Sequence, residues 1–397
     1  AGCIRRIYGE IALKILFYKW NAYNLYDTRT TFEALGHTVT MLDKPIHNPE
    51  EDSGYVDWLC CKLKKEPYSF LFSINYFPVL AEACHISKLP YACWNCDSPL
   101  LAMYHKSVFY PTNIIFCFDR SNCEEFRILG VKNIFHLPLA VHTERLSRQI
   151  SIDTSNKYPV SFVGSLYGKN SFDRIAGKLP PYLCGYLEGA MNAQLLVSGG
   201  NLLELLLTDD ICLMIEELMD YHQSAHSFAS TRNLFASTVL GFKTASLERY
   251  QNLNALSLSV PVHLFTDSFT DNLPLVHIHG PVDYLSEMPQ VFYDSKINLN
   301  MTIPNIKTGI PLRIWDILGS GGFALTNYQA EFDGIFQAGG TLDIFEDQEE
   351  LIDKAAFYLN HDSIRNKIAR QGLELVTKEH NYTVRITQMF QQIAHCI

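Results

Sequence analysis

The stretch from Ile297 to Asn327 constrains the fold of this chain more than any other. It begins with an alternating apolar run, Ile297–Met301, which predicts a short buried strand. A loop with two prolines and a glycine follows, and Pro311 stands where a first helical residue is expected. The helix should continue to Gly319, where a glycine-rich turn stops it before a second apolar strand. The stretch therefore predicts a strand–helix–strand unit of an α/β protein.

The N-terminus of this expected helix is a candidate binding site for an anion. A helix start has N–H groups without helical partners and the positive end of the helix dipole. We therefore expect the backbone of Thr308–Leu312 to hold a phosphate or diphosphate. Arg313 and Asp316 are three residues apart and share one face of an otherwise apolar helix. Asp316 is expected either to accept hydrogen bonds from a ribose or to form a local ion pair with Arg313.

Strands and helices alternate along most of the remaining chain. Apolar runs alternate with helical segments, which predicts a mostly parallel sheet covered on both faces. The expected strands include Leu13–Tyr18, Thr38–Leu42, Phe70–Ile74 and Asn133–Leu137, and the expected helices include Leu100–Lys106 and, later in the chain, Tyr284–Tyr293. The polar stretch Ser147–Lys157 is expected to link two domains, and a new strand follows at Val160–Val163. No G-x-G-x-x-G follows the first strand, so a classical dinucleotide site is not expected in the first half.

These patterns predict two Rossmann-like domains, at residues 1–150 and 151–380. Helical periodicity over most of Gly168–Leu256 predicts an insertion in the second domain, at about 175–256. Its Leu- and Met-rich faces are expected to form a core, and a dimer or partner surface is the alternative. A last helix, at 381–397, is expected to cross back to the first domain.

Composition and charge exclude several classes of protein. The chain has 397 residues, of which 47% are hydrophobic and 19% charged, values typical of globular proteins. The formal charge of −10 argues against a nucleic-acid surface. No run of residues is long and apolar enough to predict a membrane span, and Ala1–Trp20 lacks the apolar core of a signal peptide. We therefore expect a cytoplasmic location.

Eleven cysteines occur at irregular spacing. Cys93–Cys96 forms a C-x-x-C, but Asp97–Pro99 follows at once, so a helix is expected to start only after the second cysteine, unlike in redox motifs. A zinc site that adds Cys84–His85 would place two ligands side by side, which suits tetrahedral geometry poorly. Reduced structural thiols are the favoured interpretation. The histidines of His277–His279 are likewise expected to flank a ligand cleft rather than to bind metal.

Several of these residues stand in a pattern that resembles a known family. Ser295–Asn300, Gly309–Arg313, Asp316 and Gly321–Thr326 resemble the donor-binding segment of group 1 glycosyltransferases of the GT-B fold. The resemblance is greatest to the CgeB-like (spore-maturation-protein-like) branch. Trp94 and other residues of the first half resemble the uncharacterised domain that precedes this module in that branch.

The resemblance implies an α/β GT-B protein, with two Rossmann-like domains facing a cleft. The first domain would bind the acceptor and the second a nucleotide-sugar, and the enzyme would transfer the sugar to a glycan, lipid-linked or protein acceptor, as in cell-surface glycan biosynthesis. The chain contains no Asp-x-Asp triplet, so no metal is expected, and no cofactor besides the donor substrate. The implied donor-site residues are Gly164, Ser165, Tyr284, Lys307, Thr308, Gly309, Ile310, Pro311, Leu312, Arg313 and Asp316.

One departure from the family pattern affects the expected chemistry. Retaining members usually carry a pair of glutamates here; Asp316 takes the second position, whereas the first falls near Thr308, which is not acidic. An inverting enzyme would need a general base in the first domain. Asp97 is the first candidate because it follows a predicted strand, and Asp119 and Asp27 come next; the alternative for Asp97 is a helix N-cap. A non-catalytic nucleotide- or sugar-binding scaffold of the same fold is the alternative function.

Overall fold

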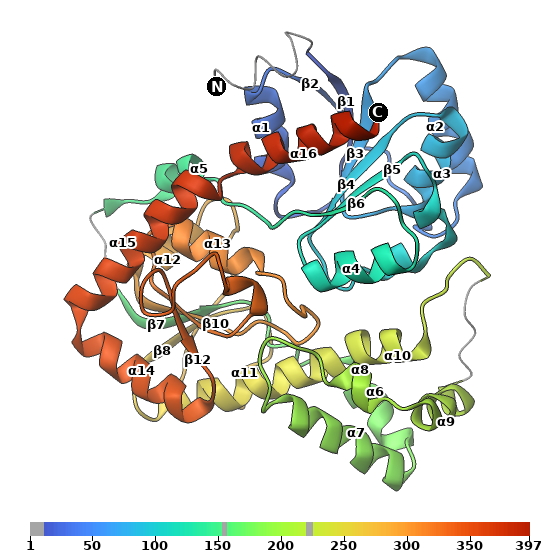
Figure 1. Ribbon diagram of the computed structural model, residues 1–397. Coiled ribbons are helices and arrows are strands. Elements are labelled where there is room, and N and C mark those ends of the chain that lie inside the picture. Colours follow the sequence, from blue (N-terminus) through green and yellow to red (C-terminus); the bar gives the residue numbers. More distant parts are fainter. Residues whose placement is uncertain (1–11, 153–156, 220–224) are drawn as a thin grey trace. The chain divides into compact units, whose positions relative to one another are not determined.

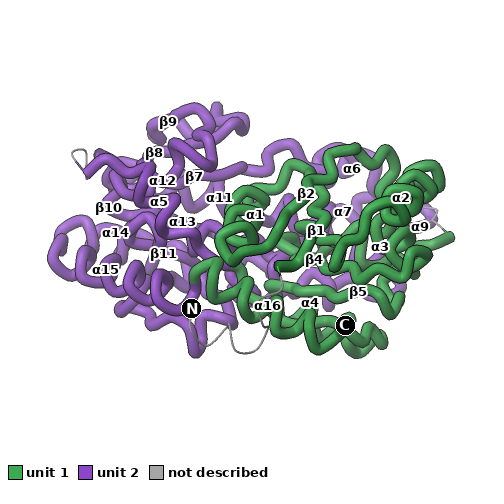
Figure 2. Tube along the Cα trace, turned by 90° about the horizontal axis from the view of Figure 1, so that it is seen from above, with its two compact units in different colours: residues 1–139, 223–229, 381–397 green, residues 140–222, 230–380 purple. Residues whose placement is uncertain are grey.

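The computed structural model describes residues 12–152, 157–219 and 225–397 (Figure 1). Residues 1–11, within the segment Ala1–Trp20 where no signal peptide is expected, lie outside this part, as do residues 153–156 of the expected linker. The chain divides into two compact units (Figure 2). Unit 1 comprises residues 1–139, 223–229 and 381–397, and unit 2 comprises residues 140–222 and 230–380. The first boundary thus precedes the expected one at residue 150.

Unit 1 contains a six-stranded, wholly parallel sheet in the order β2-β1-β3-β4-β5-β6. Its strands are β1 (Lys14–Tyr18), β2 (Thr38–Leu42), β3 (Phe70–Ile74), β4 (Tyr91–Asn95), β5 (Asn113–Cys117) and β6 (Ile134–His136). Its α-helices are α1 (Leu25–Ala34), α2 (Ser53–Lys65), α3 (Pro78–Ser87), α4 (Arg120–Ile128) and α16 (Tyr382–Cys396). Where one helix was expected at 100–106, two short 3₁₀ turns occur, Leu101–Tyr104 and Lys106–Phe109.

Aromatic side chains fill much of the core of unit 1. The rings of Phe17 and Phe32 both pack edge-on against Phe72, with centroids 5.0 Å apart in each pair. Phe390 of α16 lies against Phe32, with ring centroids 5.2 Å apart, so the last helix covers this face of the sheet. Such rings bury large apolar areas, which provides most of the favourable free energy of packing.

Unit 2 contains a second parallel sheet, in the order β12-β11-β10-β7-β8-β9. Its strands are β7 (Tyr158–Val163), β8 (Val262–Phe265), β9 (His277–His279), β10 (Ser295–Asn300), β11 (Ala324–Asn327) and β12 (Asp343–Phe345). Helices α5 (Thr143–Gln149), α12 (Met288–Asp294), α13 (Leu312–Gly319), α14 (Gln348–Asn360) and α15 (Asp362–Glu379) accompany it. The expected α/β class with two Rossmann-like sheets is confirmed.

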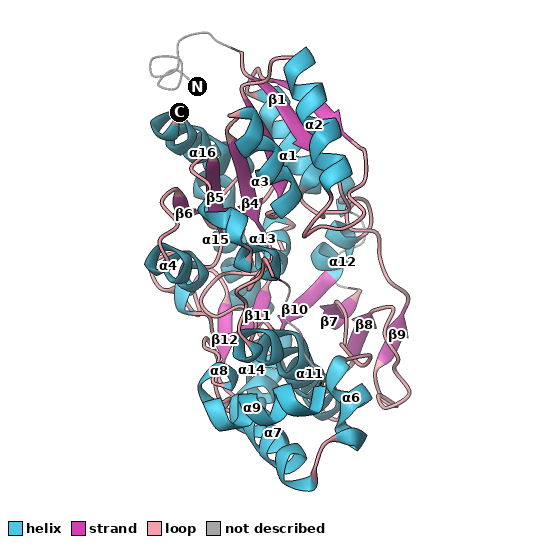
Figure 3. Cartoon of the chain, turned by 90° about the vertical axis from the view of Figure 1, so that its right-hand side faces the viewer, coloured by secondary structure: helices cyan, strands magenta, loops and turns pink. Residues whose placement is uncertain are grey.

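Helices occupy the chain between β7 and β8, where the sequence predicts an insertion. They are α6 (Ser171–Ile175), α7 (Pro181–Gln194), α8 (Leu203–Leu206), α9 (Asp209–Met219), α10 (Thr231–Leu234), a π-helical segment η6 (Phe235–Gly241) and α11 (Phe242–Ser257). Helices α6 to α9 lie close together in Figures 1 and 3. They share an apolar core that includes Leu183, Leu187, Ile211 and Leu240, all of them buried. No helix in the described residues is long and apolar enough to cross a membrane.

Local sequence signals explain several element ends. Asp119 and Asp347 cap α4 and α14, because their carboxylates accept hydrogen bonds from the backbone N–H groups of Ser121 and Glu350. Gly130 follows α4 at a φ of +102°, a conformation that glycine adopts without strain. Pro311, expected as the first helical residue, is instead the N-cap residue of α13.

Candidate active site

The sheet of unit 2 reverses its strand order between β7 and β10. The chain runs from β7 to β8 and β9 on one side and then returns to place β10 beside β7 on the other. Parallel α/β sheets bind ligands beyond the carboxyl ends of their strands at such a point. The loop after β7 carries Gly164 and Ser165, and the loop after β10 leads through Lys307 to Leu312. The structure therefore brings these two predicted segments to one end of the sheet.

The loop between β10 and α13, residues 301–311, is held by side-chain hydrogen bonds. The side chain of Asn327, at the end of β11, accepts a hydrogen bond from Thr302 N (2.8 Å) and donates one to Thr302 O (3.0 Å). The Thr308 hydroxyl donates to Glu331 Oε1 (2.9 Å), and Glu331 N donates to Thr308 O (3.1 Å). Because both ends of the loop are fixed, its backbone is held in one conformation ahead of α13.

Helix α13 begins directly after this loop. Its N-cap, Pro311, makes no side-chain cap bond, as expected for proline. The helix is buried from Ile314 to Gly319, so its backbone direction is set by packing. Gly319 illustrates how tight this packing is: a Cβ there would lie 2.1 Å from Val141 Cγ2. The first-turn N–H groups of α13 can therefore serve as a fixed anion site.

Two predicted donor-site residues, Asp316 and Tyr284, are in contact. The Tyr284 hydroxyl donates to Asp316 Oδ1 (3.2 Å), and Asp316 is buried, with 3% of its surface exposed. The Arg145 guanidinium lies over the Tyr284 ring, 5.4 Å from its centroid, and its Nη1 donates to Leu285 O (3.4 Å). The Asp316 carboxylate, the Tyr284 phenol and the Arg145 guanidinium thus form one polar cluster at α13.

Arg313 does not follow the expectation of a local ion pair with Asp316. Its guanidinium lies 5.5 Å from the centroid of the Phe292 ring and contacts the sulfur of Met288, both in α12. The structure therefore directs Arg313 to α12, and the two side chains form no ion pair. Sequence spacing placed the two side chains on one helical face, but packing against α12 separates them.

Lys307 and Ser165 are both engaged within unit 2. Lys307 Nζ forms an ion pair with Glu204 Oε2 of α8 at 2.7 Å. The Ser165 hydroxyl accepts a hydrogen bond from Tyr167 N (3.1 Å) and lies 3.4 Å from the hydroxyl of Ser268. Ser165 therefore shapes the turn after β7, whereas Lys307 carries a charge at the end of the loop.

Two site residues escaped the sequence analysis, Glu248 and Arg249 of α11. Arg249 donates to Ser165 O (2.5 Å) and Met301 O (2.7 Å), so it ties together the loops after β7 and β10. Glu248 Oε1 accepts from Asn327 Nδ2 (3.4 Å), and burial raises the pKa of its carboxyl to about 7. No sequence signal linked them to the strand ends, because they lie at the end of a helical insertion.

Unit 1 reverses its strand order between β1 and β3. In the loops at this point, Trp20 Nε1 donates to Ile74 O (2.6 Å) and Asn24 Nδ2 donates to Cys96 Sγ (2.9 Å). Asn75 adopts a φ of +62°, and its side-chain oxygen accepts a hydrogen bond from Cys96 N (2.8 Å). Amide side chains therefore brace the loops after β1, β3 and β4.

Asp97 is an exposed acid that follows β4 at this end of the sheet. Its Oδ2 accepts a hydrogen bond from Asn75 Nδ2 (2.6 Å), and the residue is exposed to solvent. Surrounding protein atoms nevertheless desolvate the carboxyl, and this burial raises its pKa although the bond from Asn75 opposes the change. Asp97 is not a helix cap, because the next helical turn begins at Leu101 with Leu100 at its N-cap position.

Asp119 and Asp27 have structural positions. Asp119 is buried, caps α4 and accepts a hydrogen bond from Ser98 Oγ (2.8 Å). Asp27 is also buried, in the first turn of α1, where the positive end of the helix dipole stabilises a carboxylate. Of the three acids proposed as general base, Asp97 alone is exposed.

The cysteines and histidines form no metal cluster in the part of the chain described. There, no group of three or more His, Cys, Asp or Glu side chains could hold a metal ion. Burial raises the pKa of Cys93 well above its usual range, so this thiol stays protonated at neutral pH, unlike the nucleophile of a redox pair. His263 and His279 instead hydrogen-bond to each other, at 2.9 Å, across β8 and β9.

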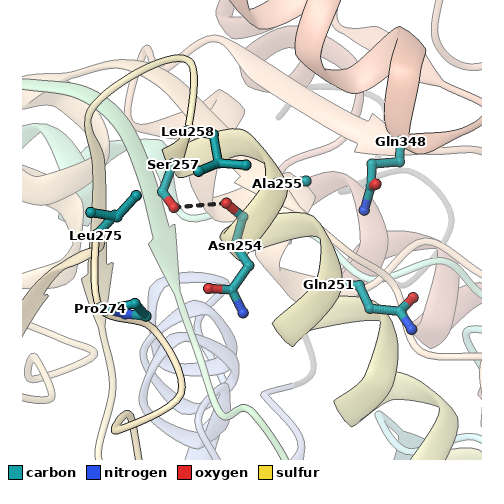
Figure 4. A pocket seen from close by; sticks show the side chains of 8 residues that line it. All are labelled: Gln251, Asn254, Ala255, Ser257, Leu258, Pro274, Leu275 and Gln348. Carbon is teal, nitrogen blue, oxygen red and sulfur yellow. Dashed lines mark hydrogen bonds between the residues drawn. The ribbon is translucent and has the colours of Figure 1, made fainter.

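A pocket of about 470 Å³ lies along α11, on another part of unit 2 (Figure 4). Its lining includes Asn254 and Leu258 of the α11 end, and Pro274 and Leu275, which precede β9. None of the residues that line the pocket belongs to the loop after β7 or to the loop between β10 and α13. The pocket is therefore separate from the loops after β7 and β10.

Comparison with known proteins agrees with this geometry. Residues 247–391 match the model of a protein family described as "Glycosyl transferase-like". This segment contains β8 to β12, α13 and the loop that precedes it. No curated protein matches the sequence.

Solved structures share the fold over almost the whole chain at low sequence identity. A glycosyltransferase from Rickettsia africae has a TM-score of 0.53 at 10% identity, covering 98% of this chain and 99% of its own. HepE of Anabaena, solved with UDP and glucose, has a TM-score of 0.57 at 10% identity, covering 96% and 100%. An α-glucosyltransferase solved with UDP and DNA has a TM-score of 0.54 at 9% identity, covering 97% and 100%. Residues 247–391 thus resemble a glycosyl transferase-like family, and the whole chain shares the GT-B fold of these solved structures.

Proposed function

We propose that the protein transfers a sugar from a nucleotide-sugar to an acceptor hydroxyl, with the donor bound at the strand ends of unit 2. The observation that carries this proposal is the buried helix α13, whose first turn follows a fixed loop at the point where the sheet reverses its strand order. UDP-sugars are the first donors to test, since HepE was solved with UDP and glucose. We further propose that the protein belongs to the CgeB-like branch of these glycosyltransferases.

The leaving group explains why such a site would accelerate the reaction. When the bond from the anomeric carbon to the phosphate oxygen breaks, negative charge develops on the nucleoside diphosphate. The backbone N–H groups of Thr308–Leu312 and the ammonium of Lys307 would stabilise this charge without reorganisation. Asp316 would accept hydrogen bonds from the ribose, with Tyr284 holding its carboxylate in place.

Unit 1 would supply the general base. We propose that Asp97 removes the proton from the acceptor hydroxyl as its oxygen attacks the anomeric carbon, so that the configuration inverts. Its exposure makes the carboxylate accessible, and a pKa raised by burial brings it closer to that of an efficient base. The acceptor would be a glycan, lipid-linked or protein hydroxyl.

Two further parts of the proposal concern the metal requirement of the reaction and the location of the protein in the cell. The transfer would need no metal ion, because the backbone N–H groups of Thr308–Leu312 and the Lys307 ammonium would stabilise the charge on the diphosphate. The location would be the cytoplasm, where thiols stay reduced; the described cysteines, from Cys60 to Cys396, are all free. Activity that persists after treatment with EDTA would support metal independence, and activity restored only by added Mg²⁺ or Mn²⁺ would contradict it.

The test is direct binding and turnover. Purified protein should be titrated with UDP-, GDP-, dTDP- and CMP-sugars by calorimetry, and donor hydrolysis should be followed by release of the nucleotide. We expect one nucleotide class to bind and to be hydrolysed slowly, and Asp316→Asn to weaken its binding. Binding without turnover with any acceptor would indicate a scaffold of the same fold, and no binding at all would overturn the donor site.

A further inference from the structure

Besides the bonds from α11 to Met301, the helical insertion of unit 2 contacts the loop ahead of α13 through Asn305 and Lys307. Asn305 Nδ2 donates to Ser237 O (2.9 Å) in the π-helical segment η6. The neighbouring Gly241 leaves no room for a side chain, because a Cβ would lie 2.3 Å from Asn305 Oδ1. Two residues further along the loop, Lys307 pairs with Glu204 of α8. The insertion is thus built against the segment that carries the proposed diphosphate contacts.

The second contact has the chemistry of a ligand site. Lys307 Nζ lies 2.7 Å from Glu204 Oε2, and each side chain is only 19% exposed. A carboxylate resembles a phosphate in charge and in accepting hydrogen bonds from an ammonium. Lys307 immediately precedes the Thr308–Leu312 backbone. Glu204 therefore pairs with the same ammonium that a diphosphate bound at the start of α13 would contact.

We propose that Glu204 is an internal competitor of the donor diphosphate, which must displace it from Lys307 in order to bind. This inference rests on the proposed function. Without a donor, the ion pair with Glu204 balances the charge of the largely buried Lys307 ammonium. When the donor binds, its diphosphate takes over the ammonium and the Glu204 carboxylate turns to solvent.

Displacement of Glu204 would be transmitted to the insertion. Helix α8 is held at its end by Tyr186, whose hydroxyl donates to Leu206 O (2.7 Å), and by Arg232, whose Nε donates to Leu207 O (2.7 Å). These partners belong to α7 and α10. A change at Glu204 therefore acts on a helix that is bonded to two others, so donor binding and the conformation of the insertion would be linked.

Glu204→Gln tests the competition directly. The amide keeps the size of the side chain but removes the charge that competes with phosphate. We expect the variant to bind UDP and inorganic pyrophosphate about 3- to 30-fold more tightly than the unchanged protein, as measured by calorimetry. In a Lys307→Met background the same change should have no effect, because the contested cation is gone.

A matched control is the ion pair between Lys243 and Asp173, which has the same 2.7 Å distance and also lies in the insertion. Asp173→Asn should leave both affinities unchanged, and thermal unfolding should show that each variant is folded. Equal or weaker binding by folded Glu204→Gln would overturn the inference while leaving the donor site in place. Failure of every variant and the unchanged protein to bind either probe would overturn the donor site itself.

Discussion

The two sheets present contrasting surfaces where their strand order reverses. In unit 2 the loop ahead of α13 is fixed by Asn327 and Glu331, and a lysine and a helix start stand at its end. In unit 1 the corresponding loops are braced by Asn24 and Asn75 and present one exposed carboxylate, Asp97. The strand ends of unit 2 are thus suited to binding a negatively charged group, whereas those of unit 1 expose a negatively charged side chain. The same topology therefore serves two chemical roles, which are set by a few loop residues.

The largest expected effect comes from unit 1. Asp97→Asn should lower kcat by about 10²- to 10⁴-fold, because proton removal from the acceptor is lost. The dissociation constant of UDP should stay unchanged, because the donor contacts lie in unit 2. Steady-state kinetics and calorimetry measure the two quantities. Asp57→Asn, an exposed acid on α2, is the control and should change neither. A parallel loss of UDP binding in Asp97→Asn would contradict the division of roles.

The complementary change in unit 2 should act on binding. Asp316→Asn should weaken UDP binding roughly 10- to 100-fold, the range expected for loss of a hydrogen bond to a charged acceptor. Tyr284→Phe, which removes only the hydroxyl that holds the carboxylate, should weaken it less. Titration of folded variants with UDP measures this, and an unaltered affinity in Asp316→Asn would remove this residue from the donor site.

Glu248 predicts a pH effect confined to unit 2. Its pKa is about 7 when folded and near 4.5 when unfolded, so between these values the folded state binds more protons. Stability should therefore fall as pH rises from about 4.5 to 7, by at most about 1.4 kcal/mol per pH unit. Glu248→Gln should lose this contribution. Urea unfolding across pH would show it, and identical pH profiles for the two proteins would refute it.

The smallest expected effect concerns Asn75. Its amide opposes the burial that raises the pKa of Asp97, so Asn75→Gly should raise this pKa further while tolerating the positive φ. Because Asp97 must be ionised to act as a base, the acidic limb of the kcat profile should move to higher pH. A profile measured from pH 5 to 8 tests the sign. A shift toward lower pH would show that Asn75 does not stabilise the carboxylate.

Much of the fold followed from local patterns. The strands at Thr38–Leu42 and Phe70–Ile74 begin and end as predicted, because alternating or continuous apolar runs ended at polar turns. The helix expected at 284–293 is shorter, Met288–Asp294. Residues 283–286 instead form a turn in which the Asp283 carboxylate accepts from Leu285 N and from the backbone and hydroxyl of Ser286.

The candidate site was predictable in its backbone and less so in its side chains. Lys307–Leu312 precedes a helix in the sequence, and the strand order of unit 2 places this segment where ligands bind. Arg313 and Glu204 illustrate the limit. Arg313 turns to α12, and Glu204 reaches Lys307 from about a hundred positions earlier in the chain. Neither contact follows from spacing, because both depend on how separate elements pack.

The amino-acid sequence alone therefore specified the class of fold, the insertion and the helix start that should meet a diphosphate, since these depend on periodicity and on turn residues close together in the chain. Packing assigned the side chains their roles: Asp119 became a cap, Asp97 the exposed acid, and Glu248 a carboxyl with a raised pKa. The physical reason is that solvation and hydrogen-bond partners are set by residues distant in sequence, which come together only when the sheets and helices have packed.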